Sequence, residues 1–483
     1  MIDYLLLHWK SLLASLWLVT GIYLALRIIW QQRAPVATLA WIMILGLVPP
    51  VGILVYHLFG PTRVNRQTLR RTRSRILLAS ENDMDKLLEG EFSPSVTERQ
   101  HQRLIEAACG IPVSSCSRTE RLRNGDATFS AILQAVAEAR LHIHLEYYIF
   151  DPDATGSALL DALTTKAREG VRVRLLVDGL GSARLLGRRG RALLQAFRDA
   201  GGELAVFHPA RLHRMLPFVN LRTHRKILVV DGHIGFTGGI NVTDDGCEKQ
   251  NPDSAYRDTH LRLEGAAVRW LQYTFMQDWV YASGRHQFEV NVFPPQEPGE
   301  HAVQVLASGP DSGREAIHRS MLHAINMAKV RILLTTPYFV PTEPAFYALI
   351  NAALRGVDVQ IMVPMRSDSF LVTWAARSYF GALRTVGVKI FEYQSKGMLH
   401  AKTLVVDDEY SMIGTANFDN RSFLLNFENG VVLYGEEMNA ILAEDFADDR
   451  TRARYVTQEI MDQRSQWHER MLTAFARLLS PLL

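Results

Sequence analysis

Five residue types recur with the same spacing in two separate stretches of the chain, and their side chains suit chemistry at phosphorus. The first set is His224, Lys226, Asp231, Gly238 and Asn241, and the second is His400, Lys402, Asp407, Gly414 and Asn417. Phosphodiester cleavage needs a nucleophile, a proton donor for the leaving oxygen and hydrogen-bond donors for the non-bridging oxygens. One His-Lys pair carries little information, but two copies predict a shared site with two facing imidazoles.

The residues between each Lys and Asp are apolar and β-branched, which is typical of a buried strand. These runs are 227–230 and 403–406. Because residues two apart share a strand face, each His and its Lys should point the same way. Asp231 and Asp407 have the opposite parity, so we expect them at the strand ends in a supporting role.

Two acidic residues are candidates for orienting the imidazoles, since a nucleophilic histidine needs its second nitrogen held by an acceptor. Asp258 follows the first motif and Glu428 the second, each at the start of an apolar segment. The alternative is that both are ordinary surface carboxylates. The pairs Gly238-Gly239 and Gly414-Thr415 should let backbone amides approach the phosphate.

A divalent metal is not needed by this set of side chains, and the sequence predicts neither a metal nor another cofactor. His142, His144 and Glu146 share one face of an expected strand and form the alternative metal site. No fourth ligand accompanies them.

Helix-like and strand-like segments alternate in the same order in both halves. The first half has helical 129–140 and 157–169 with strand-like 141–150 and 171–177; the second has helical 317–329 and 344–355 with strand-like 330–340 and 357–363. This alternation predicts two tandem α/β halves with pseudo-two-fold symmetry and mostly parallel sheets. Their boundary is expected in the proline-rich stretch 293–300.

Two long apolar stretches precede these halves and are each long enough to cross a bilayer. They cover about 11–29 and 36–58, so residues 1–60 should form a transmembrane hairpin. A cleaved signal peptide is the alternative for the first stretch. Six arginines lie between positions 63 and 75, which predicts a cytoplasmic catalytic part and attraction to anionic membrane lipids.

Length and composition limit the remaining possibilities. The 483 residues predict several domains: the hairpin, a basic juxtamembrane linker at 61–115, a first half at 116–295 and a second at 296–483. A net charge of +3 gives no broad basic face for nucleic acid. The three cysteines have no metal-ligand spacing and do not pair off, which suits a reducing compartment.

Three further segments combine apolar with basic residues and could face lipid. They are 211–219, 370–383 and the C-terminal 467–483. Core packing is the alternative for the first two. For the last, docking onto the domain and lying on the membrane are equally open.

The paired motif resembles the signature of the phospholipase D superfamily, and within it the chain is most similar to bacterial cardiolipin synthases. The shared segments are Ala37-Thr-Leu-Ala-Trp, Leu58-Phe-Gly-Pro, Leu145-Glu-Tyr-Tyr-Ile-Phe, Ala307-Ser-Gly-Pro, Thr336-Pro-Tyr-Phe-Val-Pro, Asn417-Phe-Asp-Asn-Arg-Ser and Ser480-Pro-Leu-Leu. One departure is Gly239, where the usual pattern has a serine. The resemblance implies transfer of a phosphatidyl group between two phosphatidylglycerols, which gives cardiolipin and glycerol, at the bacterial inner membrane.

The expected roles are His224 as nucleophile, forming a phosphatidyl-histidine, and His400 as general acid and then base. The reverse assignment stays open because of the pseudo-symmetry. A phospholipase D-type hydrolase, transfer to another alcohol, a lipid-binding scaffold and a nuclease are the competing functions. The sequence leaves the oligomeric state unknown.

Overall fold

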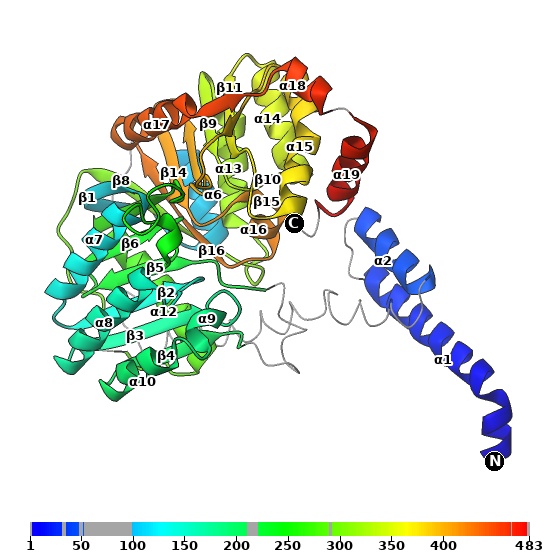
Figure 1. The fold of residues 1–483 in the computed structure, drawn as a ribbon, viewed down its shortest axis with the longest axis horizontal. Coiled ribbons are helices and arrows are strands. Elements are labelled where there is room, and N and C mark those ends of the chain that lie inside the picture. The colour runs from blue at the N-terminus through cyan, green and yellow to red at the C-terminus, as the bar shows by residue number, and fades with distance from the viewer. Residues whose placement is uncertain are drawn as a thin grey trace. The chain divides into compact units, whose positions relative to one another are not determined.

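The computed structural model describes residues 2–30, 35–47, 52, 99–209, 221–288, 292–464 and 466–480 (Figure 1). The chain divides into two compact units. One comprises 1–69 with 211–220, and the other comprises 70–210 with 221–483. The second unit holds both copies of the repeated motif.

The first unit contains two helices, α1 (Ile2–Trp30) and α2 (Pro35–Leu47). They pack on each other through buried Leu24, Ile28 and Leu45, with Trp41 beside them. Among the residues that the structure describes, no helix combines the length and apolarity needed to span a bilayer. The hairpin of two spans therefore stays a prediction. Most of 48–58 and the arginines at 63–75 lie outside the described residues.

The second unit is built on one sheet of 15 strands. Its first half comprises α6 (Arg99–Cys109), β1 (Ser114–Arg123), α7 (Asn124–Glu138), β2 (His142–Tyr147), α8 (Ala154–Arg168), β3 (Arg172–Asp178), α9 (Ala183–Leu186), α10 (Arg191–Asp199), β4 (Glu203–Phe207), β5 (Lys226–Val230), β6 (Ile234–Gly238), the short 3-10 helix Asp244–Gly246, β7 (Thr259–Gly265) and α12 (Ala267–Ser283).

The second half repeats this order and adds elements at its end. It comprises β8 (His301–Ser308), α13 (Ala316–Met327), β9 (Arg331–Thr335), β10 (Phe339–Val340), α14 (Glu343–Leu354), β11 (Asp358–Pro364), α15 (Phe370–Thr385), β12 (Lys389–Tyr393), β13 (Thr403–Val406), β14 (Tyr410–Gly414), β15 (Phe418–Asp419), α16 (Asn420–Leu424), β16 (Glu428–Tyr434), α17 (Glu436–Thr451), β17 (Ala453–Tyr455), α18 (Gln458–Gln463) and α19 (Trp467–Leu478).

The strand order shows the predicted pseudo-symmetry. From the middle outward it reads β1-β7-β6-β5-β2-β3-β4 in one direction and β8-β16-β14-β13-β9-β11-β12-β17 in the other. The halves join where β1 pairs antiparallel with β8. Each motif strand, β5 or β13, therefore has an equivalent place in its half.

The expectation of mostly parallel sheets is wrong. Only β2-β3-β4 and β9-β11-β12 pair in parallel within the large sheet, and the described pairings on the other side of β2 and β9 are antiparallel. The reason is local. Each motif strand turns back immediately through a tight turn at Asp231-Gly232 or Asp407-Asp408, so its successor must run antiparallel.

Equivalent helices in the two halves have equivalent ends. Asp153 caps the start of α8 by accepting from the Gly156 amide, and Thr342 caps α14 in the same way. After these helices Gly170 and Gly356 take φ values of 90° and 89°, a region that favours glycine. The predicted helix-strand-helix-strand order is confirmed in both halves.

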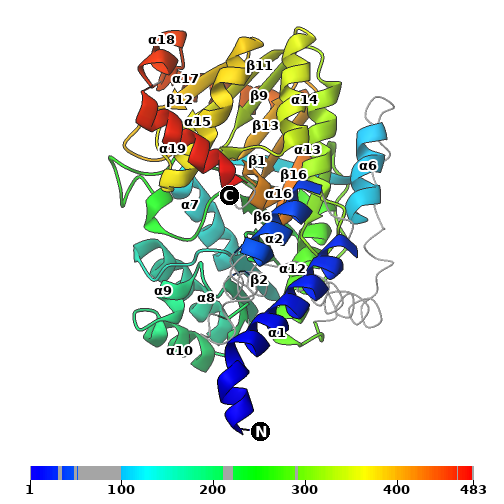
Figure 2. The same cartoon turned by 90° about the vertical axis from the view of Figure 1, so that its right-hand side faces the viewer.

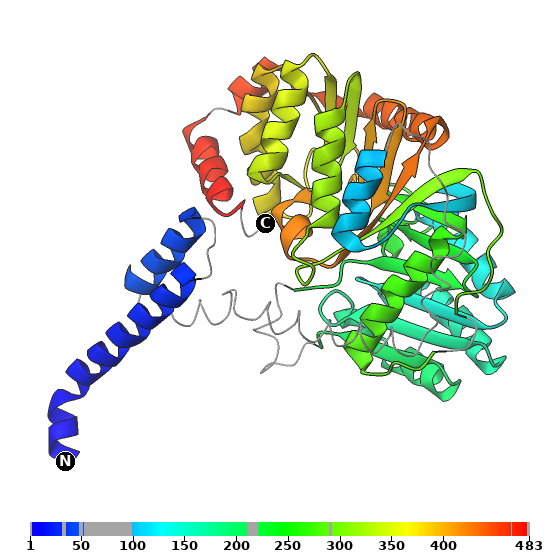
Figure 3. The same cartoon turned by 180° about the vertical axis from the view of Figure 1, so that it is seen from behind.

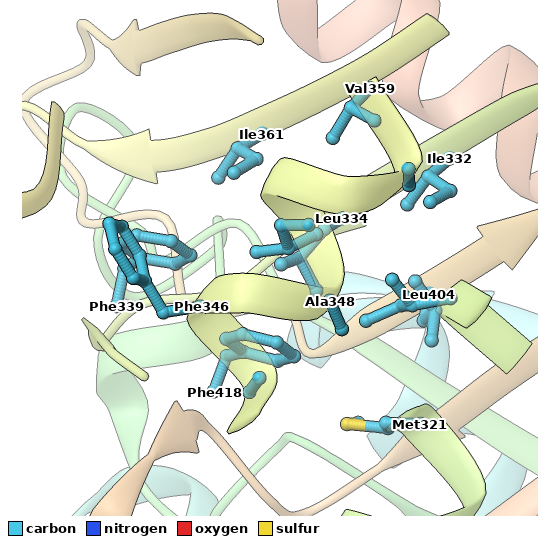
Figure 4. Close-up of a cluster of buried hydrophobic side chains, with 14 of the residues drawn as sticks. Met321, Ile332, Leu334, Phe339, Phe346, Ala348, Val359, Ile361, Leu404 and Phe418 are labelled. Atoms are coloured by element: carbon cyan, nitrogen blue, oxygen red, sulfur yellow. The ribbon is translucent and has the colours of Figure 1, made fainter. Parts of the chain in front are cut away.

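Alternation along the motif strands divides the core between the two faces of the sheet. In β5, Ile227 and Val229 pack under α12, whereas Leu228 packs with the helices of the opposite face. In β13, Leu404 lies under α13 and α14, in a cluster that includes Phe346 (Figure 4). Figure 3 shows α12 and α13 on the side of the molecule turned away in Figure 1.

The segments around the expected domain boundaries are irregular. Residues 284–300, which contain the proline-rich stretch, hold no described helix or strand. Within the predicted linker 61–115, α6 packs against α13 of the second half, with Ile105 in that half's core. The helix thus belongs with the second half, although it precedes the first in sequence.

The segments considered for lipid contact have different outcomes. The stretch 211–219 lies outside the described residues. Most large residues of 370–383 belong to the core, including Tyr379 and Phe380, although Phe370 is exposed. The C-terminal helix α19 docks on α15 (Figure 2).

Candidate active site

The two motif histidines lie where the halves meet, and each is tied there by backbone bonds. The His224 amide donates to the Phe427 carbonyl at 2.8 Å, and the His400 amide donates to the Arg257 carbonyl at the same distance. A single β-bridge accompanies each bond, Thr223 with Phe427 and Arg257 with Leu399. The partner of each bond comes from the other half, so neither motif is positioned by its own half alone.

The carboxylates are exchanged between the halves in the same way. Glu428 of the second half receives Nδ1 of His224 at 2.9 and 3.0 Å from its two oxygens. Asp258 of the first half receives Nδ1 of His400 at 2.6 Å. Both predicted orienting acids therefore bind an imidazole, and both are buried, so the surface-carboxylate alternative does not hold. With Nδ1 held, each ring has Nε2 left for chemistry.

The electrostatics of these pairs follow from burial and neighbouring charge. Burial alone would raise the pKa of Glu428, but His224, Thr415 and Lys226 hold it below its usual value. Burial lowers the pKa of His224 to about 4, with Glu428 opposing the shift. His224 is therefore a neutral imidazole near pH 7, which is the form a nucleophile requires.

The second pair has the same pattern with different contacts. Burial and then Lys402 lower the pKa of His400, while Asp258 opposes this shift. Burial alone would raise the pKa of Asp258, but Lys402 and His400 hold it below its usual value. The hydrogen bond to Asp258 counteracts part of this lowering and so helps His400 to take up the proton that a general acid passes on.

The two lysines are buried beside their histidines. Lys226 donates to the His224 carbonyl at 2.9 Å, and Lys402 donates to the His400 carbonyl and lies 3.1 Å from Nδ1 of that ring. Burial, followed by repulsion from Lys402, lowers the pKa of Lys226 to about 7, and burial lowers that of Lys402 to about 8. Two ammonium groups that repel each other in one buried site are suited to binding an anionic phosphate.

The motif aspartates lie at the opposite ends of their strands from the histidines. Asp231 accepts the amides of residues 140–142 at 2.8 Å, and Asp407 accepts those of 329–331. Both take positive φ values, 52° and 51°. They anchor the start of β2 or β9 to the motif strand, as their parity predicts, and are positioning residues.

Two amides of these glycine turns are used within the protein. The Gly239 amide donates to Thr259, and the Gly414 amide donates to Lys402. The glycines instead allow close strand approach: a Cβ at Gly238, where φ is 147°, would lie 2.6 Å from the His260 Cα. A Cβ at Gly414 would lie 2.9 Å from the Asn429 carbonyl oxygen.

The motif asparagines keep an unused polar atom. Within the part of the chain that the structure describes, the buried Oδ1 atoms of Asn241 and Asn417 have no hydrogen-bond partner. Asn417 also donates to Asp419 at 3.4 Å. A pair of unsatisfied amides at equivalent positions is suited to a polar ligand, because a buried polar atom without a partner is costly.

Several contributors were missed from the sequence. Tyr148 places its ring 5.1 Å from that of His224 and lies under the Lys226 ammonium. Arg225 donates to the Glu428 carbonyl at 3.1 Å and pairs with buried Asp278. The available signal was an arginine inside a motif that otherwise leads into an apolar strand.

The alternative metal residues have protein partners instead. His144 lies 3.1 Å from Arg174 and 2.6 Å from Gln272, and Glu146 accepts from the Thr223 hydroxyl. In the described part of the chain, no three His, Cys, Asp or Glu side chains are grouped to hold a metal.

Comparison with known proteins gives the family of the chain. Residues 132–279 and 321–450 match the family model described as cardiolipin synthase, phospholipase D-like domain. The chain belongs to the cardiolipin synthase family. Residues 19–61 match a second model, the phospholipase D-nuclease N-terminal region.

The relatives cover nearly the whole chain. Cardiolipin synthase 1 of Bacillus anthracis is 40% identical over 97% of this chain and 93% of its own length. Cardiolipin synthase of Geobacillus kaustophilus is 42% identical over 98% and 95%. The chain is therefore an enzyme, a phosphatidyltransferase. The crystal structure of phosphatidylserine synthase from Haemophilus influenzae shares the fold, with a TM-score of 0.61, 16% identity, and coverage of 80% of this chain and all of that one.

Proposed function

We propose that the chain joins two phosphatidylglycerol molecules into cardiolipin and releases glycerol, through a phosphatidyl-histidine on His224. The observation that carries this proposal is the crossed pairing of His224 with Glu428 and of His400 with Asp258. It supplies two imidazoles in one site, each with Nδ1 held and Nε2 left for reaction.

In the first step Nε2 of His224 attacks phosphorus and the bond from phosphorus to the glycerol oxygen breaks. His400 gives its proton to that oxygen, so glycerol leaves as a neutral alcohol. In the second step His400 takes the proton of a glycerol hydroxyl on the second lipid. The new oxygen attacks phosphorus, and the His224 imidazole leaves.

The other candidate site residues support these steps. Lys226 and Lys402 would neutralise the non-bridging oxygens, where charge builds up as the nucleophile attacks. Asn241 and Asn417 would bind a polar group of the lipid headgroup. One phosphodiester replaces another, so the scheme needs neither a nucleotide nor a cofactor.

The substrate is a lipid, so we place the enzyme at the bacterial inner membrane, held by a hairpin at 11–29 and 36–58. The domains of the proposed arrangement are this hairpin, the basic linker 61–115 and the halves 116–295 and 296–483, with both halves on the cytoplasmic side. The basic linker would also attract anionic lipids.

The test is to incubate the purified full-length protein with phosphatidylglycerol alone and to separate cardiolipin, phosphatidic acid and glycerol. We expect cardiolipin and glycerol in equal amounts. Phosphatidic acid without cardiolipin would identify a hydrolase instead. Cardiolipin formed only after another donor lipid is added would overturn the substrate assignment.

A further inference from the structure

The C-terminal helix α19 turns its apolar face away from the domain on which it docks. Trp467, Met471, Phe475 and Leu478 follow one another at helical spacing, and they are 77%, 63%, 60% and 77% exposed. We call these four residues the apolar stripe. Amphipathic helices on a domain normally turn such a stripe toward the core.

The helix is held to the domain by small and polar groups. Ala476 is its only described residue that is buried. The Arg477 guanidinium lies 4.9 Å from the Tyr379 ring of α15 and donates to the Ser378 carbonyl. The docking side is thus occupied, so the apolar stripe cannot rotate inward without breaking these contacts.

The end of α19 is tied to the second motif. Asn420 donates from Nδ2 to the Ser480 carbonyl at 3.1 Å and to the Val340 carbonyl at 3.2 Å. Asn420 begins α16, three positions after the motif residue Asn417. The apolar stripe therefore belongs to a helix fastened to the loop that leaves the active site.

The surroundings of the apolar stripe favour a lipid surface as its occupant. Arg470 lies on the same helix and is exposed, whereas Arg477 is held by the docking contacts. Long basic side chains beside an apolar face reach anionic headgroups while their stems cover apolar surface. Phe370, at the start of α15, is a further exposed aromatic residue, at 63%.

We propose that the apolar stripe inserts into the surface of an anionic bilayer and turns the second-motif side of the active site toward it. This inference rests on the proposed lipid substrates. With α19 in the interface, the acyl chains of both substrates could stay in the bilayer while the headgroup phosphates enter the site. Moving apolar side chains out of water is favourable, so four together are a substantial anchor.

The first test measures where the apolar stripe lies. Phe475→Cys is labelled with a polarity-sensitive fluorophore in the full-length protein, with Cys109, Cys116 and Cys247 replaced by alanine. The protein is reconstituted in vesicles of phosphatidylglycerol and phosphatidylcholine, some carrying quenchers on the acyl chains. We expect a blue-shifted emission that these quenchers reduce.

Matched control positions lie just before β2 and β9, at the ends of these strands that are away from the motif histidines. Leu141 and Val330 are 53% and 67% exposed, and their amides bind the motif aspartates Asp231 and Asp407. Labels at Leu141→Cys and Val330→Cys should show little acyl-chain quenching. Equal quenching at all three positions would overturn the proposed orientation.

The second test measures what the contact does. The apolar stripe is changed to serine at all four positions, and activity is compared on vesicles and on a short-chain soluble phosphatidylglycerol. We expect a loss of at least roughly tenfold on vesicles and little change on the soluble substrate. The double variant Leu141→Ser/Val330→Ser should keep both activities.

The outcomes separate this inference from the proposed function. If the label at position 475 is quenched only by a quencher carried on other copies of the chain, the apolar stripe lies in a dimer interface. If the label is shielded from water even in detergent, the apolar stripe contacts another part of the same chain. Either result overturns the inference while wild-type cardiolipin synthesis stands. Absence of cardiolipin from wild-type protein would instead overturn the proposed function.

Discussion

The two histidine–carboxylate pairs occupy equivalent places but are built differently. Glu428 binds His224 and is fixed by the Thr415 hydroxyl and by Asn426, which donates at 3.1 Å. Asp258 binds His400 over a shorter distance through one carboxylate oxygen. The backbone amide of Thr259 donates a hydrogen bond to the other oxygen. The first histidine thus has a longer acid held by side chains, and the second a shorter acid held by backbone.

This difference explains why Gly239 stands where the usual family pattern has a serine. The residue equivalent to Gly239 in the second half is Thr415, and its hydroxyl donates to Glu428. A Cβ on Gly239 would lie 2.0 Å from Oδ1 of Asp258, so the shorter carboxylate takes up the space of a side chain. We infer that the two pairs were fitted to different tasks, with His224 kept neutral as nucleophile and His400 supported as acid and base.

Removing either imidazole should have the largest effect. His224→Ala and His400→Ala should each reduce turnover at least about a thousandfold, since nucleophile and acid act as one unit. With labelled phosphatidylglycerol and acid quench, His400→Ala should retain phosphatidyl label on His224. Label on His400 in the His224→Ala protein would reverse the roles of the two pairs.

Neutralising the acids should rank next and should follow the crossed pairing. Glu428→Gln should impair formation of the labelled intermediate, as a defect at His224 would. Asp258→Asn should impair both this formation, where His400 is the acid, and the transfer to the second lipid, where His400 is the base. We expect losses of about a hundredfold or more, because the amides no longer favour the required imidazole forms. Single-turnover labelling separates the two steps. The opposite assignment would mean that each acid serves the histidine of its own half.

Substituting Arg225 tests a contact that supports the His224–Glu428 pair and has no equivalent at the His400–Asp258 pair. It joins the Glu428 carbonyl to buried Asp278, and its equivalent in the second half is Ala401. Arg225→Leu should lower the free energy of unfolding by about 3–5 kcal/mol, because it removes the cation that is paired with the buried Asp278 carboxylate. As a control, Lys389→Ala breaks an exposed pair with Asp358 and should cost no more than about 1 kcal/mol. Chemical denaturation measures both, and equal losses would argue against a special role for Arg225.

Restoring a hydroxyl at Gly239 should have a smaller effect. Gly239→Ser must displace Asp258, so we expect activity to fall about tenfold through the proton transfers that His400 makes. Thr415→Gly should produce a loss of similar size in the first step. If Gly239→Ser instead raised activity, the asymmetry between the pairs would have no functional value.

The pH dependence should give the smallest and most graded effect. The pKa values of Lys226 and Lys402 are about 7 and 8, so raising the pH through this range removes the positive charge that binds phosphate. We expect kcat/KM on soluble substrate to fall as the pH rises. In Lys226→Arg, whose charge persists, the fall should begin at higher pH. An unchanged profile would show that the lysine charges do not control binding.

The sequence by itself determined the repeated motif, the strands that carry it, the α/β halves and the two acids that orient the histidines. These features depend on local periodicity and on residue types at fixed spacing, which can be read from the sequence without knowing the fold. The parity of Asp231 and Asp407 likewise placed them at the strand ends.

Only the tertiary structure decided which acid serves which histidine. The bridges at Thr223 and Arg257 join residues about two hundred and about one hundred and forty positions apart, and no local pattern records that exchange. The antiparallel pairing, the use of the glycine amides within the sheet and the outward face of α19 were also tertiary outcomes. In each case the sequence limited what a segment could bury or donate, and the neighbours that the fold supplied determined which of those possibilities was used.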